Sequence, residues 1–332
     1  MDSSKLILYI KIIFIFGLVH HSVYGQLNRE NSNSLEFEDN GNFIVGKVRG
    51  RPVFQYNYAF LKPDNPQQNY YKRNGFIHPV YSPKGGTITE GFPKNHAHHH
   101  GMFNAWVNTR FKGEIIDFWN IQDGLGTVVF KEVLGLVTYR DYGILKVKHH
   151  HLAFIKGDSI PVLEEIWKIK LYNSSDPFIW DITIEQKNIS MSNFEILKYH
   201  YGGLAFRGRD EWNKNPIKKE RTTTDSCNFN IITNSQKTRI EGNHTIPKWV
   251  NMYGRIGYDD MSLTVIPLSN NSKFPDYVRI HPDLPYFCFT PVVKNGFTLK
   301  PSEMFITKYR IIADNEPINY RSLKALNKMI YR

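Results

Sequence analysis

Short runs in which apolar and polar residues alternate follow one another along most of the chain, separated by residues typical of turns. This alternation is typical of β-strands that bury one face. We expect strands at residues 43–45, 51–60, 75–81, 126–131, 134–139, 144–155, 161–171, 178–186, 195–206, 252–256, 261–266, 287–293 and 304–312. No internal repeat or long linker divides the chain after residue 36. The sequence therefore predicts an all-β fold, a large antiparallel β-sandwich in a single domain over residues 37–332.

The two ends of the chain break this pattern. A basic residue precedes an apolar run at residues 6–19, and residues 23–25 suit a signal peptidase, so we interpret residues 1–25 as a cleavable signal peptide. Residues 26–36 are polar and are expected to form a flexible leader. Helical spacing of apolar residues is convincing only at residues 321–331, which predicts a short C-terminal helix. We expect the mature protein to be secreted or periplasmic, without a membrane anchor.

Composition and charge narrow the expected partners. The full chain has a formal net charge of +11, and because residues 1–25 carry two lysines and one aspartate, the mature chain has +10. This surplus favours acidic partners. The basic residues are scattered and match no nucleic-acid-binding motif, so an anionic saccharide is the more natural acidic partner for an exported protein. The two cysteines, Cys227 and Cys288, could form one disulfide, although Cys288 lies in an apolar run typical of a buried strand.

The most distinctive segment is Asn95-His96-Ala97-His98-His99-His100-Gly101, in which four of the thirteen histidines fall within five residues. Histidine titrates near neutral pH and is the commonest metal ligand, so this clustering indicates a site. If the segment is extended, His96, His98 and His100 share one face and His99 points to the other. A His-rich exposed loop is the alternative. The Gly-Phe-Pro before the run and the apolar residues after it favour a functional site.

Two later segments carry further candidates. Asp117 could orient a histidine, and Trp119, two residues on, could stack on a sugar ring. His200 and Tyr201 precede two glycines, which permit close backbone approach. Arg207 could then grip a carboxylate with two parallel hydrogen bonds. These residues would line a cleft beside the histidine segment.

Other histidines lie on predicted strands. His78 could join His96 and His98 as the third nitrogen of a metal site if the strands are neighbours. The triplet at residues 149–151 lies on an alternating strand, where we expect surface histidines without a function.

In their order and spacing, these motifs resemble those of one family. His78-Pro79, residues 95–101, Asp117-Phe118-Trp119 and residues 201–207 are similar to the motifs of secreted bacterial proteins of unknown function that carry the label "methane oxygenase PmoA". The resemblance covers most of the mature chain. A methane monooxygenase subunit spans the membrane repeatedly, and no segment of the mature chain has the ~20 apolar residues that this requires. The label therefore implies neither methane nor copper.

The histidine core departs from that family at two positions. The family's usual Asp-His-Pro-His-His is Asn95-His96-Ala97-His98-His99 here. An asparagine still accepts a hydrogen bond but stabilises an imidazolium less well than an acid does. More distantly, residues 95–101 and His200 resemble histidine motifs of the aldose-mutarotase-like supersandwich proteins, which implies the same fold and a carbohydrate substrate.

Three functional hypotheses follow. The first is an exported carbohydrate-active enzyme, a hydrolase, lyase or epimerase, whose saccharide substrate could be anionic. Its catalytic residues would be His96, His98, His99, His200 and Asp117, and its substrate-binding residues Trp119, Tyr201, Arg207 and His100. Histidine suits this role because its pKa lies near neutral pH. The second is a metal-dependent enzyme with one divalent ion, zinc, manganese or iron, on His78, His96 and His98. The third is a glycan-binding module without catalysis, using aromatic platforms.

Overall fold

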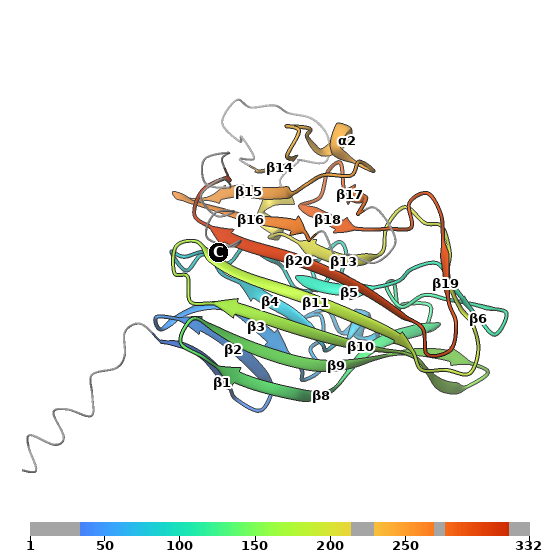
Figure 1. The fold of residues 1–332 in the computed structure, drawn as a ribbon. Coiled ribbons are helices and arrows are strands. Elements are labelled where there is room, and N and C mark those ends of the chain that lie inside the picture. The colour runs from blue at the N-terminus through green and yellow to red at the C-terminus, as the bar shows by residue number, and fades with distance from the viewer. Residues whose placement is uncertain (1–33, 214–228, 269–275, 319–332) are drawn as a thin grey trace, which may run out of the picture. The chain divides into compact units, whose positions relative to one another are not determined.

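The computed structural model describes residues 34–213, 229–268 and 276–318, and the regular secondary structure of this part of the chain is almost entirely β-strand (Figure 1). All strand pairs are antiparallel, and they form two eight-stranded sheets and one four-stranded sheet. The first sheet contains, in spatial order, β1 (Leu35–Asp39), β2 (Phe43–Val48), β3 (Arg51–Asn57), β4 (Phe76–Val80), β5 (Met102–Ala105), β13 (Gly203–Arg207), β18 (Tyr286–Phe289) and β17 (Val278–Ile280).

The second sheet holds the longest strands. Its order is β14 (Phe229–Thr233), β15 (Val250–Ile256), β16 (Asp259–Pro267), β20 (Met304–Asp314), β11 (Phe178–Asn188), β10 (Asp158–Tyr172), β9 (Tyr142–Ile155) and β8 (Gly126–Thr138). The small sheet contains β19 (Phe297–Leu299), β12 (Phe194–Ile196), β6 (Thr109–Phe111) and β7 (Glu114–Ile116). Within the described residues, helical structure is limited to the short elements η1 (Pro66–Tyr71), η2 (Asp210–Asn213) and α2 (Arg239–Gly242).

The two large sheets face one another across a shared core. The Phe54 ring on β3 lies 5.6 Å from the Trp180 ring on β11, and Tyr56 lies 6.4 Å from Trp167 on β10. All four side chains are fully buried, and they belong to one apolar cluster that draws on both sheets. Burial of such surface, at about 25 cal/mol per Å², is what holds the sheets together. The predicted all-β sandwich is confirmed.

The strand predictions are confirmed for the long runs and differ at several boundaries. Residues 126–131 and 134–139 form the single strand β8, which has bulges between Phe130 and Glu132 and between Val133 and Gly135. Conversely, the strand expected at 195–206 is divided into β12 and β13, which belong to different sheets.

Glycine explains that division. Gly202 and Gly203 have φ values of 139° and 88°, which redirect the chain before β13. A Cβ at Gly203 would lie 2.5 Å from the Phe289 carbonyl oxygen. The close backbone approach expected at these glycines is therefore confirmed.

Several predictions concern the ends of the chain and the cysteines. Strand β1 begins at Leu35, two residues inside the expected leader. The signal peptide, the rest of the leader, the C-terminal helix and Cys227 lie outside the described residues. Cys288 is buried and unpaired, as expected of a small apolar side chain on β18. Within the described ranges, no helix is long and apolar enough to cross a bilayer.

Candidate functional site

A pocket of about 210 Å³ brings together side chains from five separate segments of the chain. Its lining residues are His96, His98, His99, Asn120, His200, Tyr201, Arg279, His281 and Tyr286. Five of the nine are histidines, so the pocket assembles the predicted cluster with two histidines from distant parts of the sequence. His96, His98, His99, His200 and Tyr201 were expected at one site, and the structure brings all of them together.

The histidine segment is a pair of turns and not the extended strand that was expected. The His96 N–H donates to the Pro93 carbonyl at 3.0 Å, and the His99 N–H donates to the His96 carbonyl at 2.9 Å. The chain then enters β5 through Gly101, which has a φ of 73°. A Cβ at this position would lie 2.5 Å from the Ile77 carbonyl oxygen, so the position requires glycine. The turns bring His96, His98 and His99 to one side and direct His100 away.

The imidazole rings of the pocket touch one another. The centroids of the His98 and His99 rings are 4.5 Å apart, and His96 lies 5.3 Å from His99. On its other side His99 stacks on Tyr286 at 4.6 Å and 15°. His281 approaches His96 at 6.4 Å. The pocket wall is therefore a continuous surface of aromatic nitrogen heterocycles and phenols.

These histidines are neutral at pH 7. Burial lowers the pKa of His98, and the nearby His96 and Arg207 lower it further, to about 4, because a proton on His98 would be repelled by Arg207 and by a protonated His96. Burial with the charge of Arg279 lowers the pKa of His281 to about 4. Burial also lowers the pKa of His96 and, more strongly, of His99. A neutral imidazole has one donor and one acceptor, so it can accept a proton from a bound group.

The tautomer of His281 follows from its backbone contacts. Its Nδ1 accepts hydrogen bonds from the N–H groups of Asp283, at 3.1 Å, and Leu284, at 3.0 Å. In the neutral ring the proton is therefore on Nε2, and His281 can donate from that atom.

Asp117 lies behind the pocket and orients one of its lining residues. Its carboxylate accepts from the Trp119 and Asn120 N–H groups at 2.7 and 2.9 Å, and from the Asn120 side-chain amide at 2.6 Å. The Asn120 amide in turn lies 3.3 Å from the Tyr201 hydroxyl. Asp117 thus fixes Asn120 and Tyr201 and does not itself line the pocket.

Three residues expected to bind substrate lie outside the lining. Trp119 is fully buried, with its ring 5.3 Å from Tyr201 and 6.2 Å from Tyr286, so it packs behind the pocket and is not free to stack on a sugar. Arg207 is also fully buried and pairs with Asp210 at 2.7 Å. His100 is enclosed by three phenylalanine rings, those of Phe76, Phe92 and Phe103.

The proposed metal ligands do not assemble. His78 does not line the pocket with His96 and His98; its Nδ1 is 3.0 Å from the Thr89 hydroxyl. Among the described residues, no group of three or more His, Cys, Asp or Glu side chains is arranged to hold a metal ion. The triad His78, His96 and His98 therefore does not fit a metal.

Four lining residues were missed by sequence reasoning: Asn120, Arg279, His281 and Tyr286. Arg279 lies on β17, His281 directly follows the last residue of that strand, and both side chains line the pocket. An Arg-Ile-His run is a weak signal by itself, because only the pairing of β17 with β18 brings it to the histidine turns.

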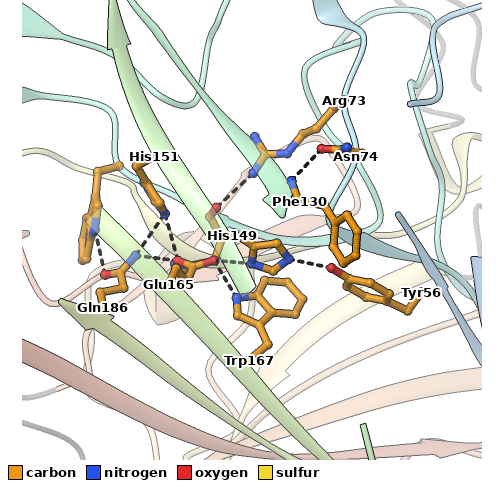
Figure 2. A network of polar contacts seen from close by, with 11 residues as sticks. Tyr56, Arg73, Asn74, Phe130, His149, His151, Glu165, Trp167 and Gln186 are labelled. Carbon is orange, nitrogen blue, oxygen red and sulfur yellow. Dashed lines mark hydrogen bonds and ion pairs between the residues drawn. The ribbon is translucent and has the colours of Figure 1, made fainter. Parts of the chain in front are cut away.

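A second polar cluster lies in the core between the large sheets and centres on the fully buried Glu165 of β10 (Figure 2). One carboxylate oxygen accepts from Trp167 at 2.6 Å and from His149 at 3.1 Å. The other accepts from the side chains of Asn104 at 2.6 Å, Gln186 at 2.6 Å and His151 at 3.0 Å. Five donors thus saturate one buried carboxylate.

Glu165 is held in its charged form. Burial disfavours the carboxylate, but His151 and His149 outweigh burial and lower the pKa of Glu165 below its usual range. His149 and His151 are fully buried, so the expectation of surface histidines on this strand is wrong. Asn104 of β5 and Tyr56 of β3, whose hydroxyl is 2.6 Å from His149 Nε2, come from the first sheet. The cluster therefore ties the two sheets together.

His100 makes the fold acid-sensitive, and one substitution tests this. Its side chain is 0% exposed, neither ring nitrogen has a partner among the described residues, and burial keeps its pKa well below 6.5. The unfolded chain takes up a proton near pH 6.5 and the folded chain does not, so stability falls as pH drops below 6.5. Between pH 7 and pH 5, we expect the free energy of unfolding to fall by up to about 2 kcal/mol less in His100→Leu than in the wild type. Urea titrations at both pH values measure it; an unchanged pH dependence would contradict it.

A large antiparallel β-sandwich with a histidine-lined pocket is the class of protein that this fold and site define. The chain belongs to DUF6807, a family of unknown function, whose model matches residues 44–327. The expectation of a family without assigned function is thus confirmed. None of the curated proteins compared with the chain is significantly similar to it in sequence.

Several solved structures are similar in fold. A heparan sulfate lyase from Pedobacter heparinus has a TM-score of 0.42 and 9% identity, and the match covers 92% of this chain and 42% of the lyase chain. The galactosidase domain of an alpha-galactosidase-sucrose kinase has a TM-score of 0.37 and 8% identity, covering 85% of this chain and 39% of its own. A putative aldose 1-epimerase from Escherichia coli K12 has a TM-score of 0.33 and 9% identity, covering 85% and 99%. The chain thus spans well under half of the first two.

Proposed function

We propose that this chain is an exported carbohydrate-active enzyme that uses the histidine pocket for proton transfer on a saccharide. The observation that carries the proposal is the convergence of five histidines, two tyrosines, one asparagine and one arginine in one pocket. Sugar hydroxyls are both donors and acceptors, and so are neutral imidazoles, phenols and carboxamides. The lining therefore matches the hydrogen-bonding character of a sugar ring. Export is inferred from residues 1–25.

The lining favours a lyase or an epimerase over a hydrolase. Most glycoside hydrolases use two carboxyl groups that flank the scissile bond. None of the nine lining residues is Asp or Glu, and Asp117 is engaged by Trp119 and Asn120 behind the pocket. Neutral His96 and His98 are instead suited to removing a proton from carbon or oxygen, and His281 can donate one hydrogen bond from Nε2.

The test is a substrate screen on the mature chain, residues 26–332, produced without a His tag. Oligosaccharides are incubated in D₂O and followed by NMR, which separates the three reactions. A lyase gives a new double bond together with a new reducing end, and a hydrolase gives a new reducing end alone. An epimerase inverts one carbon, with deuterium uptake where a ring C–H is broken, or accelerates anomer interconversion at C1 without such uptake. We expect turnover that is lost in the double variant His96→Gln/His98→Gln and retained in His150→Gln, on the other face of β9. Equal turnover in the double variant would contradict the proposal. Retained ligand without product would instead favour a glycan-binding module.

A further inference from the structure

The charge of the pocket is set by one residue. Of the nine lining side chains, Arg279 alone carries a permanent charge, because the five histidines can be neutral and the others do not ionise near pH 7. No lining residue supplies a negative charge to balance it. The pocket is therefore a neutral, hydrogen-bonding surface with one fixed cation.

Among the described residues, Arg279 has no carboxylate partner, in contrast to Arg207 and Arg310. Arg207 pairs with Asp210 at 2.7 Å, and Arg310 of β20 pairs with Asp181 at 2.6 Å. No ion pair found within the described ranges involves the Arg279 guanidinium. Arg279 nevertheless is half-buried on β17, at the edge of the first sheet. A half-buried guanidinium without a counter-ion is ready to receive an anion from outside the chain.

None of the neighbours of Arg279 described below forms an ion pair with its guanidinium. Cys288, its register partner on β18, is uncharged and buried. His281 lines the same pocket, and burial together with the positive charge of Arg279 lowers the pKa of both His281 and His200. Asp283 lies just beyond His281 but gives its N–H to that ring and forms no ion pair with Arg279.

We propose, on the basis of the function proposed above, that the pocket recognises a carboxylate-bearing sugar, a uronate, through the Arg279 guanidinium. The planar fork of arginine matches a carboxylate with two parallel hydrogen bonds. The volume of about 210 Å³ is below the roughly 300–1,000 Å³ of pockets for drug-sized ligands, so it suits one sugar unit. The histidines, Asn120 and Tyr201 then contact the ring hydroxyls.

The test compares two sugars that differ only at C6. Binding of glucuronate and of glucose is measured by NMR titration to the wild-type chain, Arg279→Gln, Arg279→Lys and the control Arg255→Gln, whose arginine pairs with Asp260 on an exposed hairpin. We expect glucuronate to bind the wild type and the control at least about tenfold more tightly than glucose. Arg279→Gln should lose this preference, so that glucuronate and glucose bind it about equally, and Arg279→Lys should keep part of it.

Each contrary outcome is specific. Equal binding of the two sugars by the wild type, glucuronate binding that survives in Arg279→Gln, or no binding of glucuronate up to tens of millimolar would overturn the inference. Tighter binding of glucose 6-sulfate than of glucuronate would also overturn it, since the anion would then be a sulfate. Arg279-dependent binding of glucuronate without any turnover would support uronate recognition and contradict the proposed enzyme. Turnover of a neutral sugar that depends on His96 and His98 would support the proposed enzyme and contradict uronate recognition.

Discussion

Glu165→Ala will lower the free energy of unfolding by at least about 3–5 kcal/mol, the cost of removing one partner from a buried ionic cluster. The substitution leaves five donors in the core without their acceptor, those of Asn104, His149, His151, Trp167 and Gln186. Each unsatisfied buried donor costs about 1–3 kcal/mol, so partial relaxation still leaves a large loss. Arg73, fully buried and bonded to the Asn104 carbonyl at 3.0 Å, also loses a nearby negative charge.

Two further variants separate charge from packing. Glu165→Gln keeps the shape and one acceptor oxygen but brings an amide N–H₂ toward donors, so we expect an intermediate loss. Glu164→Ala is the matched control: it lies one position along β10, faces the other way, and its 3.6 Å contact with Lys148 is a surface ion pair worth at most about 1 kcal/mol. Urea denaturation measures all three. A loss for Glu165→Ala no larger than that for Glu164→Ala would show that the cluster does not stabilise the sandwich.

The burial of His149 and His151 could have been predicted from strand alternation, but the residue type pointed the other way. His149 and His151 have the same parity on β9 as Leu145, Val147 and Ala153, all of which are buried. Parity alone therefore assigns both histidines to the core. A polar residue type such as histidine instead suggests an exposed position. The local sequence could not correct this, because Glu165, the acceptor that makes burial of the two histidines tolerable, lies on a different strand.

The candidate site divides in the same way between local and non-local information. The composition of residues 95–101 is enough to predict a site, because four histidines within five residues lie close together in any backbone conformation. The directions of the side chains depend on two consecutive turns, which begin at Pro93 and at His96. An extended segment would instead have placed His100 on the same side as His96 and His98. Arg279, His281 and Tyr286 could not be found locally. They reach the pocket through the order β5-β13-β18-β17, a pairing of strands far apart in sequence.

With an identified substrate, His98→Gln will lower kcat/KM by about 10²–10⁴-fold if His98 is the general base, since that is the usual worth of a positioned acid or base. Ring contacts do not distinguish His98 from His96, since each ring lies within 5.5 Å of the other and of His99. His98 is tested first because its lowered pKa of about 4 gives the pH profile a definite expected position. Glutamine keeps a donor and an acceptor, so binding of the sugar should change much less than turnover.

The pH profile distinguishes a general base from a residue that only positions the substrate. Burial lowers the pKa of His98 to about 4, so the neutral form persists through mildly acidic pH. In the wild type kcat/KM should stay level from neutral pH down to about pH 5 and fall as His98 takes up a proton near pH 4; in His98→Gln this acid limb should be absent. His150→Gln should retain the wild-type profile. If His98→Gln loses activity but keeps the same acid limb, His98 positions the substrate and another group, His96 first, is the base.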